Sequence, residues 1–262
     1  QQSAHNVFTP GYGAPELVLG RSGVTSLSDA HAMAVIAFQV LTLVHPFIGD
    51  WVSEGEPELE EQAFAGGIPW VEDPVDDRNR ASFGVPRDWV LSPRLVQMFQ
   101  RAFGPGRMNP ASRPGCAELA DRLYAAADST MSCPSCKGTF YFNNKTCPWC
   151  DAVRPQFAIL VFNLWDPNID KEGGVVLNPD KKPQRVAHTV VNDGQVVQIT
   201  RRLAYGQSGK GADDPILAVK LKDGEVLIKS LNDQTYFLMS PTGTRKSEVS
   251  HQAKRFKLEE GQ

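Results

Sequence analysis

The pattern of apolar and polar residues divides the chain into a helical first part and a strand-rich second part. Apolar residues recur at helical spacing in "SLSDAHAMAVIAFQVLTLVHPFIGD" (residues 26–50), "SPRLVQMFQRAF" (92–103) and "PGCAELADRLYAAA" (114–127). In the first stretch they surround the helix axis, which predicts a helix buried on all sides. Ser28 and Asp29 are its predicted caps and Pro46 its predicted end.

The two later stretches predict amphipathic helices whose apolar faces belong to a core. Ser92 is placed to cap the first of them. The residues expected in the core are Leu95, Met98, Phe99, Phe103, Leu119, Leu123 and Tyr124.

Short β-rich runs follow one another from residue 157 onward. They read "FAILVFNLW", "QRVAHTVV", "QVVQIT", "PILAVKLKD", "EVLIKSL" and "TYFLMS", with turn residues between them. Their regular spacing predicts an antiparallel β-sandwich over residues 154–262. The glycine-rich "YGQSGKGADD" from Tyr205 matches no phosphate-binding loop and predicts a hairpin loop. The fold class is therefore multi-domain α+β.

Charge and hydropathy exclude two classes of partner. The net charge is −3, and the 16 basic and 14 acidic side chains of residues 151–262 form no dense basic field. Nucleic acid is therefore not an expected partner. Ten acidic residues gather between Asp50 and Asp77, which favours a solvated helix and loop over a docking face for a basic partner. No apolar run reaches the roughly 20 residues that span a bilayer, and no secretory signal is seen, so a cytoplasmic location without membrane contact is expected.

The five cysteines carry the most specific chemical signal. Cys133 and Cys136 form one Cys-x-x-Cys pair, and Cys147 and Cys150 form a second pair ten residues later. This spacing predicts a tetrahedral four-thiolate Zn²⁺ site. A disulfide framework or a redox Cys-x-x-Cys motif explains the pattern less well, because the chain shows no export signal and a redox motif accounts for one pair only.

Four thiolates leave no open position on the metal, so the zinc is expected to be structural. Residues 129–153 are predicted to form a zinc ribbon. Its aromatic residues are expected to cover the metal and form a small core: Phe140, Tyr141, Phe142 and Trp149. The remaining Cys116 is predicted to be a buried helix cysteine.

Three landmarks in the first part resemble a known family. Thr9-x-x-Tyr12-x-Ala14-Pro15-Glu16 resembles the end of the activation segment of a eukaryotic-like (Hanks-type) protein kinase. The stretch from residue 26 resembles the kinase F helix, with Asp29 at its start. "GRMNPASRPGCAELADRL" resembles the segment that places an Arg-Pro pair before the last helix of the kinase C-lobe. The resemblance implies that residues 1–128 are the later portion of such a lobe.

The resemblance also implies roles for individual residues. Glu16 would pair with Arg113, and Asp29 would accept hydrogen bonds from the catalytic loop. Thr9 and Tyr12 would lie in the loop that receives the substrate, with Thr9 favouring serine/threonine acceptors. Without the resemblance, Glu16 belongs to a surface ion pair and Asp29 is a helix cap.

The motifs that bind ATP and magnesium in this family are missing from the 262 residues. They are a Gly-rich loop, a strand lysine, a His-Arg-Asp loop and Asp-Phe-Gly. We therefore expect no catalytic residue in this chain and no phosphate transfer by it alone. Mg-ATP would be a cofactor only of a longer parent protein.

The second part resembles a forkhead-associated (FHA)-like sandwich in its layout. The Gly-Arg and Ser-x-x-His motifs of phosphothreonine-binding members are not matched by "RRLAYGQSG" and "SPTGTRK". This favours a structural or protein-docking role.

The order of lobe, ribbon and β-domain resembles bacterial kinase-like proteins of tellurite-resistance-associated phosphorylation systems. That resemblance implies a PP2C-type phosphatase and a von Willebrand A-type protein as partners. Two functions remain open: part of a serine/threonine kinase, or a non-catalytic scaffold on a kinase-like lobe.

Overall fold

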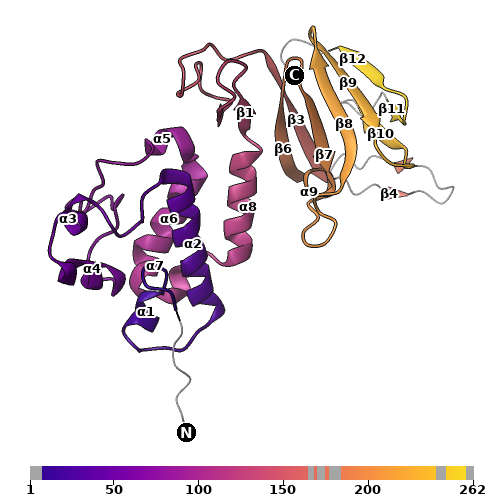
Figure 1. Ribbon diagram of the computed structural model, residues 1–262. Coiled ribbons are helices and arrows are strands. Elements are labelled where there is room, and N and C mark those ends of the chain that lie inside the picture. Colours follow the sequence, from indigo (N-terminus) through magenta and orange to yellow (C-terminus); the bar gives the residue numbers. More distant parts are fainter. Residues whose placement is uncertain (1–7, 165–167, 170–174, 177–183, 240–245, 258–262) are drawn as a thin grey trace. The chain divides into compact units, whose positions relative to one another are not determined.

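The protein is a mixed α+β chain with helices and antiparallel sheets (Figure 1). This computed structural model describes residues 8–164, 168–169, 175–176, 184–239 and 246–257. The chain divides into a helical unit, Gln1–Ala127, and a strand unit, Asp128–Gln262. The cysteine-rich residues 129–153 therefore belong to the same compact unit as the strands that follow them.

The helical unit contains eight α-helices and one short 3-10 helix among its described residues. They are α1 (Pro15–Val18), α2 (Ser26–Thr42), α3 (Asp50–Ser53), α4 (Pro57–Phe64), α5 (Arg87–Val90), α6 (Pro93–Phe103), α7 (Pro105–Met108), η1 (Pro110–Ser112) and α8 (Cys116–Ala127). No described helix is long and apolar enough to cross a membrane.

Helix α2 begins and ends earlier than the sequence predicts. Thr25 is its N-cap, and a capping box joins Thr25 and Ser28, each side chain bonded to the other's backbone N–H. Ser28 is thus the third helical residue, and Asp29 does not cap the helix. At the other end Leu43 adopts a left-handed conformation with φ of 59°, so the helix ends at Thr42, four positions before Pro46.

The prediction that α2 is buried on all sides is wrong. One face packs against α6 and α8, with Ala34, Val35 and Phe38 in the core. The other face leaves apolar side chains exposed by 42–70%: Met33, Ile36, Val40 and Leu43. The spacing of three and four residues between Met33, Ile36 and Val40 makes an apolar stripe along the helix, and Leu43 follows it at the C-cap. Apolar residues surround the axis as predicted, but no described part of the helical unit covers this stripe.

The core of the helical unit is aromatic. Phe38 of α2 meets Phe99 and Phe103 of α6 edge to face, at centroid distances of 5.2 and 5.9 Å. Ser92 caps α6 by accepting a hydrogen bond from the Leu95 N–H, as predicted. All four residues predicted to form the core face of α6 are buried. In α8, Leu119 is buried as predicted, whereas Tyr124 is exposed.

His31 of α2 is a buried titratable residue in this core. Its ring stacks on Phe47 and meets Phe103 edge to face. Its Nδ1 atom has no hydrogen-bond partner among the described residues. Burial, followed by the nearby charge of Arg113, lowers the pKa of His31 to about 3.

We expect His31 to make the helical unit sensitive to acid. The unfolded chain protonates this histidine near pH 6.5, whereas the folded chain does so only near its depressed pKa. Stability is therefore complete above pH 6.5 and is lost as the pH falls toward 3, by up to about 1.4 kcal/mol per unit. Urea unfolding of the wild type and His31→Phe at pH 7, 6, 5 and 4 should show a steeper loss in the wild type. Parallel curves would contradict this expectation.

The strand unit consists of twelve strands and one helix among its described residues. They are β1 (Thr130–Ser132), β2 (Thr139–Tyr141), β3 (Phe157–Leu164), β4 (Asn168–Ile169), β5 (Val175–Val176), β6 (Gln184–Asn192), β7 (Val196–Thr200), α9 (Arg201–Tyr205), β8 (Pro215–Lys222), β9 (Glu225–Ser230), β10 (Tyr236–Met239), β11 (Lys246–Val249) and β12 (Lys254–Lys257).

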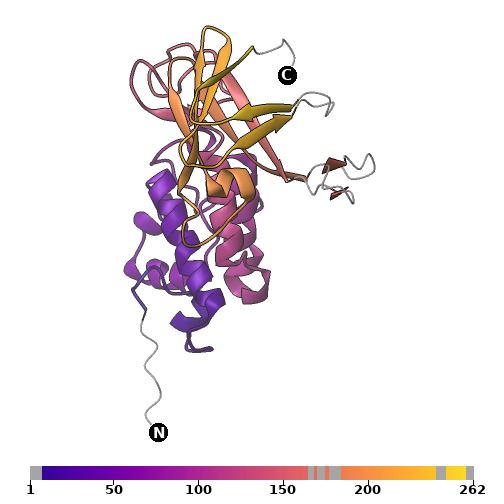
Figure 2. The same ribbon diagram turned by 90° about the vertical axis from the view of Figure 1, so that its right-hand side faces the viewer.

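The strands form several antiparallel sheets around a shared core. The largest sheet has the order β12-β9-β8-β7, while β3 pairs with β6 and β10 with β11. Side chains from these sheets and from α9 meet in one apolar cluster that includes Val191, Ile199, Leu203, Val219 and Val249. Helix α9 contacts β3, β6 and β7 (Figure 2).

All six predicted strand runs are present in this unit. Trp165, the last residue of the first predicted run, lies outside the described residues, as do residues 240–245 of the "SPTGTRK" loop. The predicted hairpin loop from Tyr205 does join two paired strands, β7 and β8, but α9 is inserted ahead of it. Positive φ angles at Gly206, Gly209 and Gly211 shape the loop.

Candidate functional site

The four cysteines of the two Cys-x-x-Cys pairs lie together in the strand unit. Their sulfur atoms all lie within 4.8 Å of one another. The Sγ atoms of Cys133 and Cys150 are 3.6 Å apart, and those of Cys136 and Cys147 are 3.7 Å apart. Each short distance therefore joins the first pair to the second.

Both pairs sit in the same kind of backbone turn. The residue after each second cysteine, Lys137 or Asp151, has a positive φ of 64° or 59°. The N–H groups of these residues donate to the carbonyls of Cys133 and Cys147, at 3.0 and 2.9 Å. A further hydrogen bond closes each turn: the Cys133 N–H donates to the Gly138 carbonyl, and the Cys147 N–H donates to the Ala152 carbonyl.

The sulfur positions fit a tetrahedral metal ion. A Zn–S bond of about 2.3 Å in a tetrahedron places two sulfur atoms about 3.8 Å apart, close to the two short distances here. A disulfide needs about 2.05 Å between sulfur atoms, so the arrangement is that of four separate thiols. The Gly138 N–H also donates to the Sγ atom of Cys136 at 3.4 Å, which is a bond that stabilises thiolate charge. The four cysteines can therefore hold a metal ion.

The cysteine thiols differ in how readily they ionise. Hydrogen bonds led by the backbone of Cys136 lower the pKa of Cys133 to about 6. Burial raises the pKa of Cys147. Four adjacent thiolates repel one another, so the fully ionised cluster requires a bound cation.

Of the four aromatic residues predicted to form a core around the cysteines, Phe140 and Phe142 do so, whereas Trp149 is exposed. Phe140 and Tyr141 of β2 are buried, and β2 pairs with β1. Phe140, Cys133 and Cys147 share a core with Val190 of β6. Phe142 packs partly against this core. Trp149 is 44% exposed and donates from its indole N–H to the Thr139 carbonyl at 2.8 Å. The ribbon is thus packed against the long strand β6.

The prediction that Cys116 is buried is wrong. Cys116 is exposed at the first residue of α8. Cys116 lies three residues before the buried Leu119, on the same side of the helix, but it stands at the very start of α8, where it is exposed.

In the helical unit, Glu16 and Arg113 form an ion pair that joins residues 97 positions apart. Both guanidinium NH groups of Arg113 donate to the carboxylate of Glu16, each at 2.7 Å. The Arg113 side chain is 1% exposed and that of Glu16 is 13% exposed. Arg113 also donates from Nε to the Gly106 carbonyl at 2.7 Å. Burial opposes the charge on Glu16, but the hydrogen bonds led by Arg113 bring its pKa below the ordinary value.

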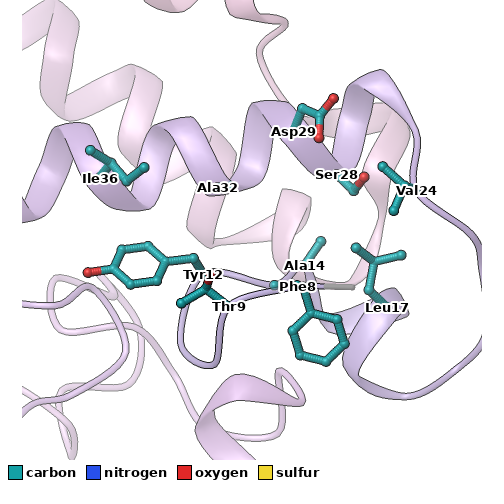
Figure 3. Close-up of a pocket in the computed structure, with 11 residues that line it drawn as sticks. Phe8, Thr9, Tyr12, Ala14, Leu17, Val24, Ser28, Asp29, Ala32 and Ile36 are labelled. Carbon is teal, nitrogen blue, oxygen red and sulfur yellow. The ribbon is translucent and has the colours of Figure 1, made fainter. Parts of the chain in front are cut away.

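A hollow of about 480 Å³ lies between the segment around Thr9 and helix α2 (Figure 3). Thr9, Tyr12 and Asp29 all line it, so the structure brings these three predicted residues together. Its walls are otherwise mainly apolar and include Phe8, Leu17, Val24 and Ile36. Asp29 is exposed at this hollow rather than bonded as a helix cap.

Two residues that position the Thr9 segment were not found from the sequence. The Tyr12 hydroxyl donates to the side-chain oxygen of Gln39 at 2.9 Å. The Nε2 atom of His45 lies 2.8 Å from the Gly11 carbonyl, and its Nδ1 accepts from the Phe47 N–H at 3.2 Å. These bonds place the proton on Nε2 and tether the segment to α2 and to the chain that follows it. The sequence predicts no role for His45, because a local pattern gives no sign of a partner 34 residues away.

The arrangement consists of a four-thiol cluster in one unit and, in the other, a hollow beside a buried Glu–Arg pair. The chain matches no known family model and shows no significant similarity to a curated protein.

Proposed function

We propose that this chain is the C-terminal part of a bacterial serine/threonine protein kinase-like signalling protein, not catalytic by itself. In this proposal the helical unit is the later part of the kinase C-lobe, from the acceptor loop to the last helix. The four cysteines hold a structural zinc ion. The ribbon and the remaining strands, as an FHA-like sandwich, recruit protein partners, among them a PP2C-type phosphatase and a von Willebrand A-type protein.

The observation that carries the proposal is the buried pair between Glu16 and Arg113. The two residues stand in two separate motifs, Ala-Pro-Glu and Arg-Pro, that resemble kinase landmarks. A bidentate, nearly solvent-free contact between them is the contact that the resemblance implies. If the two short motifs resembled kinase motifs only by chance, there would be no reason to expect Glu16 and Arg113 to be in contact.

The uncovered surface of the helical unit supports the same proposal. Thr9 and Asp29 line one hollow, where the resemblance places the acceptor hydroxyl and the catalytic loop. Ile36 lines this hollow (Figure 3) and also belongs to the exposed apolar stripe of α2 from Met33 to Leu43. Contiguous exposed apolar surface of this kind usually marks a binding site. We therefore propose that the catalytic part of a longer parent packs here.

The role of the zinc follows from its four ligands. Four cysteine sulfurs fill a tetrahedral zinc ion, so no position remains for water or substrate. Zinc would hold the two turns together and so fix β1 and β2 against Val190 of β6. The metal would therefore support the docking unit rather than take part in phosphate transfer.

We expect the 262-residue chain alone to incorporate no labelled phosphate from ATP into a generic protein substrate. The transferred phosphoryl group is stabilised by a lysine and by magnesium-binding groups whose motifs are missing from these residues. The product of the complete gene should transfer phosphate to serine or threonine. Transfer by the 262-residue chain, freed of contaminating kinases, would contradict the first expectation. A complete product that lacks transfer would favour a scaffold function instead.

A further inference from the structure

One edge of strand β3 is unpaired among the residues that the structure describes, and we call it the open edge. Within the part of the chain that the structure describes, β3 pairs only with β6, and no strand lies along its other edge. Its sequence, "FAILVFNL", contains no charged residue, proline or glycine. Edge strands in native proteins are usually protected from further pairing by charges, proline, irregularities or a covering segment. In the described chain, the β3 edge shows one such feature, a register shift after Phe162.

The hydrogen-bond pattern tells which backbone groups of β3 point to this edge. The Asp193 N–H donates to the Gln156 carbonyl at 2.9 Å, which makes residues 156 and 193 a hydrogen-bonded pair in the β3–β6 register. Such pairs alternate with non-bonded pairs in an antiparallel ladder. Ala158 and Leu160 therefore bond to β6. By the same alternation, residues 157, 159 and 161 direct their N–H and C=O groups toward the open edge.

The same odd-numbered positions carry an apolar surface. Ile159 and Val161 are 41% and 47% exposed, on the face of β3 opposite to the cluster that contains Ala158 and Val191; Phe157, on the same face as Ile159, packs against the ribbon core. Ala158, on the other face, belongs to the buried cluster of the strand unit. A strand added at this edge would therefore gain backbone hydrogen bonds and cover apolar side chains in one step.

We propose that the open edge of β3 pairs with β3 of a second copy of this chain, antiparallel and centred on Ile159. This register sets Ile159 opposite its own counterpart and Phe157 opposite Val161. Each of these pairs joins residues whose backbone groups face the open edge, so the free groups on both strands find partners. The inference is independent of the proposed kinase-like function.

A second copy suits this edge because the strand can face itself without repulsion. Like charges placed directly opposite one another destabilise a strand pair, and β3 has no charge in any register. A two-fold interface also needs only one surface patch, repeated on both partners.

The test is sedimentation of the 262-residue chain from low micromolar to submillimolar concentration. The wild type should pass from monomer to dimer. Ile159→Lys and Val161→Lys should each weaken association at least tenfold, because each places a charge against the second copy. Val196→Lys is the matched control. Val196 is an exposed valine at the start of β7, which is an edge strand of the four-stranded sheet β12-β9-β8-β7. This substitution should leave association unaltered. Zinc content and the thermal transition would show that each variant is folded.

Amide hydrogen exchange gives a second readout at single residues. The amides of Ile159 and Val161 should become protected as concentration rises, whereas those of Ala158 and Leu160 should be protected throughout. A chain that stays monomeric over the whole range would overturn the proposal. So would a dimer that persists in both lysine variants, or protection of these amides that appears only when a peptide from another protein is added.

Discussion

Cys147→Ser should remove most of the zinc affinity and unfold the ribbon while the helical unit keeps its fold. Cys147 is fully buried in the ribbon core, and its sulfur lies 3.7 Å from that of Cys136. Loss of one ligand leaves three thiols that repel one another once ionised. Structural zinc contributes on the order of 10 kcal/mol to folding in small zinc-finger peptides, so the ribbon has little else to hold it. Elemental analysis should give one zinc per wild-type chain and a small fraction of that in the variant.

Cys116→Ser is the matched control for this change. Cys116 is exposed in the helical unit and lies outside the cluster. The control should keep a full zinc content and an unchanged thermal transition. Wild-type protein with reduced thiols and no metal would contradict the zinc assignment. The same holds if Cys147→Ser retained zinc as tightly as the wild type.

Breaking the Glu16–Arg113 pair should destabilise the helical unit by about 3–5 kcal/mol, because removal of one partner leaves a buried charge unpaired. Arg113→Met should cost more than Glu16→Gln, since Arg113 also bonds the carbonyls of Gly106 and Leu27. Urea unfolding of both single variants and the double variant would measure the coupling between them. The double variant should be less destabilised than the sum of the single variants.

The chain contains an exposed ion pair that serves as a control. Arg101 of α6 bonds the carboxylate of Glu118 in α8, and their side chains are 46% and 35% exposed. Glu118→Gln should change stability by less than about 1 kcal/mol, as is usual for exposed pairs. An equally small effect at Glu16 would mean that its pair does not hold the helical unit together, and would weaken the kinase-lobe proposal.

The cysteine cluster could be predicted from the sequence because its determinants are local. Only ten residues connect the two Cys-x-x-Cys turns, so few backbone conformations can bring the turns together. The four cysteines predicted as ligands are those that the structure brings together. The positions of six strands, β3 and β6 to β10, followed from alternation and turn residues in the same way. β11 and β12 were not predicted, because "KSEV" and "KRFK" are polar and show no clear apolar alternation.

Contacts between residues far apart in the sequence could not be predicted from local sequence patterns alone. The Glu16–Arg113 contact was expected only through the resemblance, since spacing alone cannot join residues 97 positions apart. The start of α2 was misplaced because a Thr-x-x-Ser capping box lacks the usual Glu or Gln at its fourth position. The exposed stripe of α2 was missed for a different reason. An apolar run in the sequence indicates a surface that is expected to be buried. It does not tell whether residues of the described chain pack against that surface.

The most direct test of the central claim is phosphate transfer by the complete gene product with a change at Thr9. The claim is that the segment around Thr9, beside Asp29 in the hollow, receives the acceptor hydroxyl of a phosphoryl-transfer lobe. Thr9→Val keeps the side-chain volume and removes its hydroxyl, so transfer to serine and threonine should fall while the KM for ATP stays unchanged. Thr139→Val, an exposed change in the ribbon, is the control and should leave transfer intact. Equal transfer by the wild type and Thr9→Val would contradict the account, as would a complete product that lacks both the strand lysine and the magnesium-binding Asp.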